Sequence, residues 1–373
     1  MTTTPYVVKK KTPLWKTLLL LMLGATLLLG LIFFWFVSLI DNTQNTEALK
    51  ATQPTDLTYI ANAMPLTRGK ILAVVTSTDT LGNSGKATGH ELTELARAYY
   101  VFHANGFEID IASIKGGEPP VVYDFDDMAE FDYAFLNDAV AQRKVSHSMP
   151  IKDANPNDYA AVYFVGGKGA MFDFPNNVDI QTLVQQLDSR DAVIGAVCHG
   201  PAALVNVSDA EGNFLVANKQ VSAFTNSEEL FGIPNALEVF PFMLESKLRA
   251  RGSKVQAGKD FLSQVSVDNN WVTGQNPWSV WQLAEAMVVQ LGYLPRARQR
   301  TNEENTVELL SILHEYGYNA SVAFATKLIE NAGKQQISRN LVLMHAIVAG
   351  MKLNVMDTYD LLRLTMRLKN LQK

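Results

Sequence analysis

Cys198 is the single cysteine of this 373-residue chain and stands in the run AVIGAVCHGPAALV, residues 192–205. The apolar residues before it predict a buried strand, and those after it predict the start of a helix. Such a corner exposes its central residue, and a helix N-terminus behind the sulfur favours the thiolate. A nucleophile and a buried structural cysteine both remain open, and the small neighbours Gly195, Ala196 and Gly200 favour the nucleophile.

A carboxyl group close to a cysteine can share a proton with the thiol or accept one from a substrate, and burial raises its pKa for that role. Glu94 is a candidate, within the segment ELTELARAYYVFHANG of residues 91–106. The alternative for Glu94 is a solvated helix residue paired with Arg97. His199 directly follows the cysteine, but adjacency alone does not make it the base.

Composition narrows the class of function. A single cysteine excludes an intrachain disulfide and a multi-cysteine metal site. His90, His103 and His147 lack the spacing of a metal site, so no metal or other cofactor is expected. A net charge of −5 argues against nucleic acid as a partner, because phosphate binding requires a concentrated positive surface.

Strand and helix patterns alternate along the middle of the chain, which predicts a flavodoxin-like α/β fold with a mostly parallel sheet between helices. Ligands bind beyond the carboxyl ends of such strands, so the glycine-rich strand ends are expected to carry the chemistry. The predicted strands are 70–77, 107–113, 159–167, 192–198, 220–225 and 270–277, and the predicted helices include 91–106, 178–190 and 239–252.

The segment 18–40 is apolar and uncharged throughout. At about 1.5 Å per residue it spans the roughly 30 Å hydrocarbon core of a bilayer. Its length and the lack of a cleavage site favour a retained signal anchor. Lys9, Lys10, Lys11 and Lys16 precede it, so the N-terminus is expected in the cytoplasm and the rest of the protein outside, in the periplasm or extracellular space.

The resulting domain organisation has five parts. The last part shows helical periodicity without strand signals, which predicts a helical extension of three or four helices. The parts are a cytoplasmic tail (1–17), a transmembrane anchor (18–40), a polar linker (41–68), an α/β domain (69–295) and the helical extension (296–373).

Several of these segments together resemble the ThiJ/PfpI superfamily, which has the class I glutamine amidotransferase-like fold. AVCHGPAALV resembles its nucleophile elbow, and the branch containing glyoxalase III and heat-shock chaperones is the most similar. The resemblance covers about residues 69–293, with motifs in the family's order. They are TGHELTELARAYYVFHANGFEIDIASIKGGEPPV (88–122), VGGKGAMFDFPNN (165–177), VSAFTNSEE (221–229) and WVTGQNPWS (271–279).

The resemblance implies a catalytic set. Cys198 matches the nucleophile, Glu94 the glutamate that lies against it, and His199 the histidine of the elbow. Glu229 matches the acidic residue that completes the set, with Glu228 as the alternative. Backbone N–H groups of Gly166, Gly167 and His199 would form the oxyanion site.

The chain departs from the family at one position of the glycine loop. Lys168 stands in GGKG where the family usually has histidine. A backbone oxyanion donor survives that change, whereas a side-chain role of the histidine does not. A lysine ammonium instead favours an anionic or carbonyl-bearing ligand.

The resemblance implies a cofactor-independent lyase that converts 2-oxoaldehydes such as methylglyoxal to hydroxy acids, and a deglycase activity is a related expectation. The alternatives are a stress chaperone, a redox-sensing binding module or scaffold, and an amidase- or peptidase-type hydrolase on the same fold. Glutamine hydrolysis is disfavoured because His199 directly follows the cysteine. Since relatives are often dimers, a homodimer is also expected.

Overall fold

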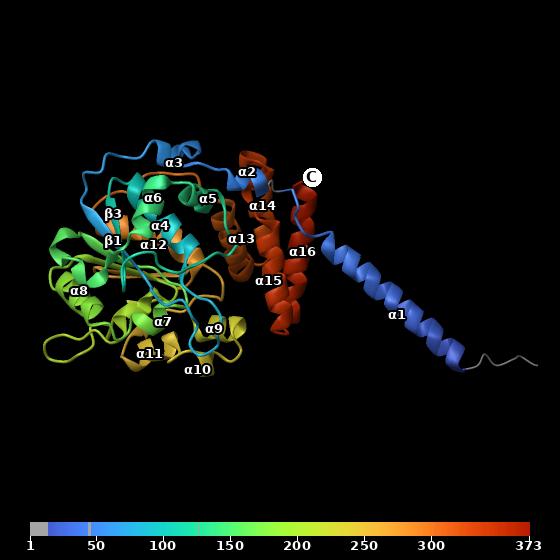
Figure 1. Cartoon of the computed structure of the whole chain (residues 1–373). Helices are drawn as coiled ribbons and strands as arrows, with labels where there is room; N and C mark the ends of the chain where they lie inside the picture. Colours follow the sequence, from blue (N-terminus) through green and yellow to red (C-terminus); the bar gives the residue numbers. More distant parts are fainter. Residues whose placement is uncertain (1–13, 44–45, 126) are drawn as a thin grey trace, which may run out of the picture. The chain divides into compact units, whose positions relative to one another are not determined.

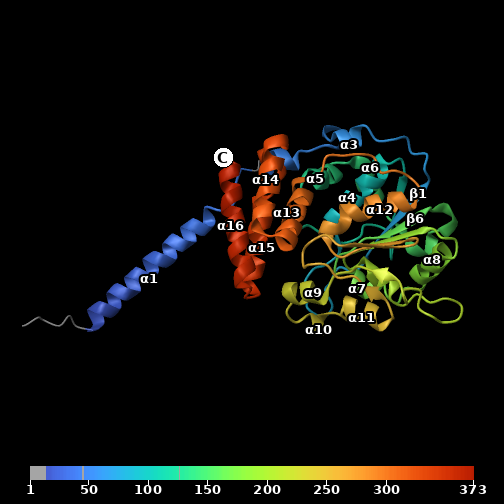
Figure 2. The same cartoon turned by 180° about the vertical axis from the view of Figure 1, so that it is seen from behind.

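The computed structural model describes residues 14–43, 46–125 and 127–373. It divides into two compact units, Asn45–Arg300 and a second formed by Met1–Gln44 with Thr301–Lys373. The first unit is an α/β domain and the second is helical (Figures 1 and 2).

The α/β unit is built on a seven-stranded sheet with strand order β10-β11-β7-β6-β1-β3-β5. All neighbours are parallel except β10, which runs antiparallel to β11 at one edge. The predicted α/β fold with a mostly parallel sheet is confirmed. The strands are β1 (Lys70–Val75), β3 (Glu108–Ser113), β5 (Met149–Pro150), β6 (Ala161–Phe164), β7 (Val193–Val197), β10 (Val265–Asp268) and β11 (Trp271–Gly274).

The central strands are apolar along their whole length because helices cover both faces of the sheet. Alternate residues of β1 show this directly, since Ile71 and Ala73 lie in one hydrophobic cluster whereas Leu72 and Val74 lie in the other. Every residue of β6 and β7 is buried. The sequence pattern of uninterrupted apolar runs thus follows from burial on two sides.

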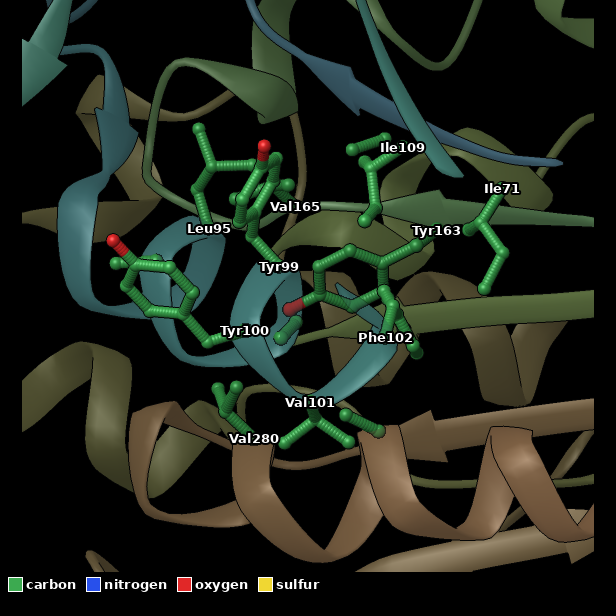
Figure 3. Packing of buried hydrophobic residues seen from close by; sticks show 14 of the residues in the cluster. Ile71, Leu95, Tyr99, Tyr100, Val101, Phe102, Ile109, Tyr163, Val165 and Val280 are labelled. Atoms are coloured by element: carbon green, nitrogen blue, oxygen red, sulfur yellow. The ribbon is translucent and has the colours of Figure 1, made fainter. Parts of the chain in front are cut away.

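One face of the sheet is covered by α4 (Leu92–Ala104) and α12 (Val280–Gln290). Figure 3 shows Phe102 of α4 and Tyr163 of β6, whose rings are 5.8 Å apart in an edge-on arrangement. The opposite face packs against α8 (Val178–Asp188), whose apolar side belongs to the second cluster. This packing holds α4, and with it Glu94, at the sheet.

The remaining elements of this unit are short. Two two-stranded sheets lie apart from the main sheet, formed by β2 (His90–Glu91) with β4 (Val121–Val122) and by β8 (Gln220–Val221) with β9 (Lys254–Val255). The other helices are α2 (Thr46–Lys50), α3 (Thr58–Ala61), α5 (Glu130–Leu136), α6 (Ala139–Ser146), α7 (Ala170–Asp173), α9 (Asn226–Gly232), α10 (Ala236–Val239) and α11 (Leu244–Ala250).

The strand predicted at 220–225 is wrong beyond Val221. Beyond Val221 the backbone N–H groups do not form the hydrogen bonds of a strand pair. Ser222 N–H donates to Thr273 Oγ1 at 2.8 Å, and Phe224 N–H donates to the Cys198 carbonyl at 2.9 Å. This segment therefore supports the cysteine corner instead of extending a sheet.

Part of the predicted linker 41–68 is packed in the α/β unit. Tyr59 and Ile60 of α3 are buried in the hydrophobic cluster on the α4 side. Asn105 Nδ2 donates to the Tyr59 hydroxyl at 3.1 Å. Residues 44 and 45 lie outside the described part of the chain.

The helical unit contains four helices in the predicted extension, α13 (Asn302–Tyr316), α14 (Tyr318–Ala332), α15 (Arg339–Met351) and α16 (Val355–Leu371). Gly317 and Gly333 end the first two with φ of 82° and 106°, positive values that glycine adopts more readily than other residues. Thr301 is the N-cap of α13 and forms a capping box with Glu304. The Thr301 hydroxyl accepts the Glu304 N–H, and the Glu304 carboxylate accepts the Thr301 N–H.

Helix α1 (Leu14–Val37) is, within the described residues, the one helix long and apolar enough to cross a membrane. Its apolar side chains are largely exposed. The helix ends at Val37, three residues before Ile40, where the sequence predicted the end of the span. Leu39 is instead buried, and its carbonyl accepts from Arg339 Nε at 2.8 Å. Most of the predicted tail 1–17 lies outside the described residues.

Candidate active site

Cys198 lies at the carboxyl end of β7 in a left-handed backbone conformation with φ of 57°. This conformation costs a non-glycine residue about 1–3 kcal/mol and is held by its surroundings. Cys198 N–H donates to the Gly274 carbonyl at 2.9 Å, and its own carbonyl accepts from Phe224. A side chain at Gly200 would collide with the Phe164 carbonyl, which explains the glycine after the corner.

The predicted helix behind the cysteine is a five-residue 3₁₀ helix, Gly200–Leu204. The expected positive end of an α-helix is therefore missing from the corner. The Cys198 side chain is buried, and burial raises the pKa of its thiol well above the usual value, with Glu94 and Glu91 adding to the rise. The corner thus lacks the α-helix expected to favour the thiolate, and a base beside the sulfur would favour it instead.

His199 is placed to be that base. Its Nδ1 lies 3.3 Å from Cys198 Sγ, and its Nε2 lies 2.6 Å from Glu229 Oε2. A carboxylate at Nε2 places the ring proton there and leaves the Nδ1 lone pair toward the sulfur. The ring packs beside Phe224 and Phe240, with centroids 4.7 and 6.0 Å away. Cys198, His199 and Glu229 thus lie in contact one after the other.

The two adjacent glutamates of α9 have different partners. Glu229 contacts His199, whereas Glu228 accepts hydrogen bonds from Gln275 Nε2 at 3.1 Å and Asn276 Nδ2 at 2.8 Å. Glu228 also caps its own helix through Thr225. The structure therefore joins Glu229 to the histidine and gives Glu228 a structural position.

Glu94 is completely buried beside the sulfur. Its Oε2 accepts the Gly166 N–H at 2.8 Å, and its backbone carbonyl accepts the Tyr163 hydroxyl at 2.9 Å. Its Oε1 is buried without a well-aligned partner among the described residues, while the carboxyl is close enough to the Cys198 thiol to share a proton with it. Burial raises the pKa of Glu94 well above its usual value, with Glu91 adding to the rise.

The glycine loop faces both of these residues. A Cβ at Gly166 would lie 2.8 Å from Cys198 Cβ and closer still to Glu94 Oε2. Since the Gly166 N–H is bonded to Glu94, it is not available to a substrate oxygen in this arrangement, which corrects one of the predicted oxyanion donors. Within residues 14–43, 46–125 and 127–373, the N–H groups of Gly167 and His199 have no acceptor and remain as donors.

Sequence reasoning did not find Glu91, which stands just before α4 and is partly buried. A Cβ at Gly167 would lie 2.8 Å from the Glu91 nitrogen, so the loop and this residue are in close contact. Burial raises the pKa of Glu91 to about 7, Asp124 and Asp127 also raise it, and Lys168 lowers it. A charged residue one turn before Glu94 on a predicted helix is by itself an ordinary surface pattern, so no signal in the sequence pointed to it.

Among the described residues, no group of three or more His, Cys, Asp or Glu side chains is arranged to hold a metal ion.

The fold and this corner define an α/β protein with a buried cysteine at the carboxyl end of a central strand, beside a His-Glu pair and a buried carboxyl. The chain belongs to the DJ-1/PfpI family, which matches residues 86–290.

Among the relatives of known name, the chain is 33% identical over 236 residues to glutathione-independent glyoxalase hsp3101 of Schizosaccharomyces pombe, covering 59% of this chain and 95% of that protein. It is 28% identical over 229 residues to Glyoxalase 3 of Candida albicans, covering 58% and 96%.

Solved structures agree on the fold. The Rapid Encystment Protein 24 KDa of Francisella tularensis is 38% identical with a TM-score of 0.57, covering 60% of this chain and 99% of that one. The glyoxalase III of Candida albicans is 26% identical with a TM-score of 0.53, covering 60% and 97%.

Proposed function

We propose that this protein is a glutathione-independent glyoxalase of the glyoxalase III type, which converts 2-oxoaldehydes such as methylglyoxal to 2-hydroxy acids with Cys198 as nucleophile. The observation that carries the proposal is the position of the Cys198 sulfur between His199 Nδ1 and the buried carboxyl of Glu94. The names of the relatives support the same reaction.

The reaction begins with addition of sulfur to the aldehyde carbon. His199 accepts the thiol proton at Nδ1, and Glu229 stabilises the imidazolium through Nε2. The aldehyde oxygen takes up a proton and the product is a hemithioacetal. The N–H groups of Gly167 and His199 are the donors that stabilise the developing negative oxygen.

A hydrogen then moves between the two carbons. A base removes the hydrogen of the former aldehyde carbon, the electron pair forms an enediolate, and the same proton is returned to the neighbouring carbon. The hydroxyl proton of the first carbon passes to the second oxygen, which leaves a thioester of a 2-hydroxy acid. Glu94 and His199 are the two groups beside the sulfur that can carry this proton.

Water completes the cycle. It attacks the thioester carbonyl, the carbon–sulfur bond breaks, and the thiol takes up a proton. The balance is one aldehyde and one water for one carboxylic acid, so no redox partner is required. The mechanism therefore uses the residues of this chain alone.

The test uses the full chain in detergent micelles with methylglyoxal and no added thiol. We expect hydroxy-acid formation that Cys198→Ala abolishes, and a thioester or hemithioacetal adduct on Cys198 detectable by mass spectrometry. Turnover that is unchanged in Cys198→Ala refutes the cysteine mechanism. Absence of turnover on several 2-oxoaldehydes, together with suppression of the aggregation of a client protein, favours the chaperone alternative.

We also propose that α1 anchors the protein in a membrane, with the α/β unit outside the cytoplasm. The length and exposed apolar surface of α1 support this, as does Lys16 at its start. Lys9, Lys10 and Lys11, which lie outside the described residues, add positive charge on the same side. An alkaline phosphatase fusion after Lys373 is expected to be active, and an inactive fusion beside an active cytoplasmic reporter refutes the orientation.

A further inference from the structure

Lys168 lies on the glycine loop of the site and has no role in the proposed reaction. The lysine directly follows Gly167 and is partly buried. Its positive charge acts on Cys198, Glu94 and Glu91, lowering the pKa of each. Lys168 is thus the cation of the site, on the loop whose first glycine contacts the cysteine.

The ammonium group of Lys168 has no ion pair or hydrogen bond with any residue of the described part of the chain. The Glu91 carboxyl likewise has no close partner there. An ammonium near a buried nucleophile and without a protein acceptor is free to bind an oxygen of the substrate.

The surrounding charges decide which oxygen that is. The carboxyl groups of Glu91 and Asp124 act on this side of the site beside the Lys168 ammonium. The Asp127 carboxylate is instead paired with Arg97 Nη2 at 3.3 Å. An additional carboxylate on the substrate would meet net negative charge, whereas a neutral carbonyl would not. The arrangement therefore suits a carbonyl oxygen that becomes negative only during the reaction.

We propose that Lys168 is a catalytic residue that binds the 2-oxo oxygen of the substrate. This rests on the proposed glyoxalase function and adds a group to it. When the base removes the hydrogen from the first carbon, the electron pair moves into the carbon–carbon bond and the charge develops on the 2-oxo oxygen. Lys168 stabilises that charge, while the backbone N–H groups of Gly167 and His199 bind the first oxygen.

The first experiment measures turnover of methylglyoxal by Lys168→Met in the full chain. We expect kcat to fall about 100-fold with a smaller change in KM, because the interaction strengthens only as charge develops. Lys168→Arg, which keeps the charge, is expected to recover part of the loss. Lys152→Met is the matched control, since Lys152 is exposed and is not among the charges acting on Cys198.

The second experiment does not depend on turnover. Alkylation of Cys198 is compared between iodoacetate, which is negative, and iodoacetamide, which is neutral. The rate with iodoacetate divided by the rate with iodoacetamide is expected to fall about three- to tenfold in Lys168→Met, because the variant lacks the positive charge that attracts iodoacetate. The same ratio is expected to rise in Glu91→Gln, which lacks a negative charge. In the wild type it should rise as the pH falls through about 7, where Glu91 takes up a proton.

Turnover and the alkylation ratio distinguish a failure of the proposed function from a failure of the role proposed for Lys168. Absence of turnover in the wild type refutes the proposed function, while the alkylation ratio still tests the position of Lys168. A Lys168→Met variant with unchanged thermal unfolding, unchanged kcat and an unchanged alkylation ratio overturns the proposal. A rise in KM alone, with kcat preserved, assigns Lys168 to ground-state binding and also overturns the catalytic role.

Discussion

Replacing Glu94 by glutamine is expected to make the protein more stable and nearly inactive. The carboxyl is buried with a pKa raised well above its usual value of 4.5, and burial is the main cause. Glutamine has almost the same shape and can still accept the Gly166 N–H through its amide oxygen. The substitution therefore removes an ionisable group from the interior while leaving the contacts of the loop in place.

The sign of the stability change follows from linkage. A group whose pKa is higher in the folded than in the unfolded state contributes its stability fully below the unfolded value and loses it as the pH rises toward the folded value. Each unit of difference corresponds to about 1.4 kcal/mol. Wild-type protein is thus expected to lose stability as the pH rises above 4.5, and Glu94→Gln is expected to lack that loss.

The activity is expected to change in the opposite direction. An amide cannot carry a proton between the two carbons, and loss of a general acid–base group typically lowers kcat about 10²–10⁴-fold. The assays are thermal unfolding between pH 4 and pH 8 and methylglyoxal turnover by the same detergent-solubilised preparations.

A Glu94→Gln variant that is less stable than wild type at pH 8 refutes the reasoning about the buried carboxyl. Full activity in this variant refutes its role as the proton carrier and leaves His199 as the base. Glu211→Gln serves as the control, because Glu211 is exposed in the loop before β8.

Three further predictions follow from contacts described above. Gly166→Ala should abolish activity and lower the melting temperature, since its Cβ would stand 2.8 Å from Cys198 Cβ; an active variant would contradict the tight packing of the loop. Glu229→Gln should lower kcat at least tenfold with little loss of stability, whereas Glu228→Gln should lower stability, because Glu228 accepts several buried hydrogen bonds; kinetics and thermal unfolding of the pair check this assignment. Arg339→Met should destabilise the helical unit by about 1–3 kcal/mol for each carbonyl left without a donor, and the carbonyls concerned are those of Leu39 and Ile40. Protease sensitivity measures this loss. Equal sensitivity of variant and wild type would exclude a role of Arg339 in holding the end of α1.

Much of the fold could be predicted from the sequence because its signals are local. Short apolar runs followed by small or polar residues mark strands buried on both sides, and β1, β6 and β7 lie where these runs stand. The cysteine corner was predictable for the same reason, since small residues surround Cys198 and neither Gly195 nor Gly200 has room for a Cβ. The family resemblance added Glu94, which no local pattern separates from a surface glutamate.

The elements that the sequence did not determine depend on partners distant along the chain. The residues 222–225 have a strand-like composition, yet their backbone bonds to Cys198 and to a threonine of β11, which end the strand at Val221. Similarly, Leu39 belongs to the apolar segment by composition, but Arg339, three hundred residues later, binds its carbonyl.

The same distinction applies to the active site. The sequence by itself indicated Cys198, His199 and the glycine loop as a candidate site, because each lies within a short motif. Only the tertiary structure decided between Glu228 and Glu229, since neighbouring helix residues point about 100° apart and the packing of α9 selects which one reaches His199. It also directed the Gly166 N–H to Glu94 and placed Glu91 beside the lysine loop, because burial and proximity arise only when α4 packs against the sheet.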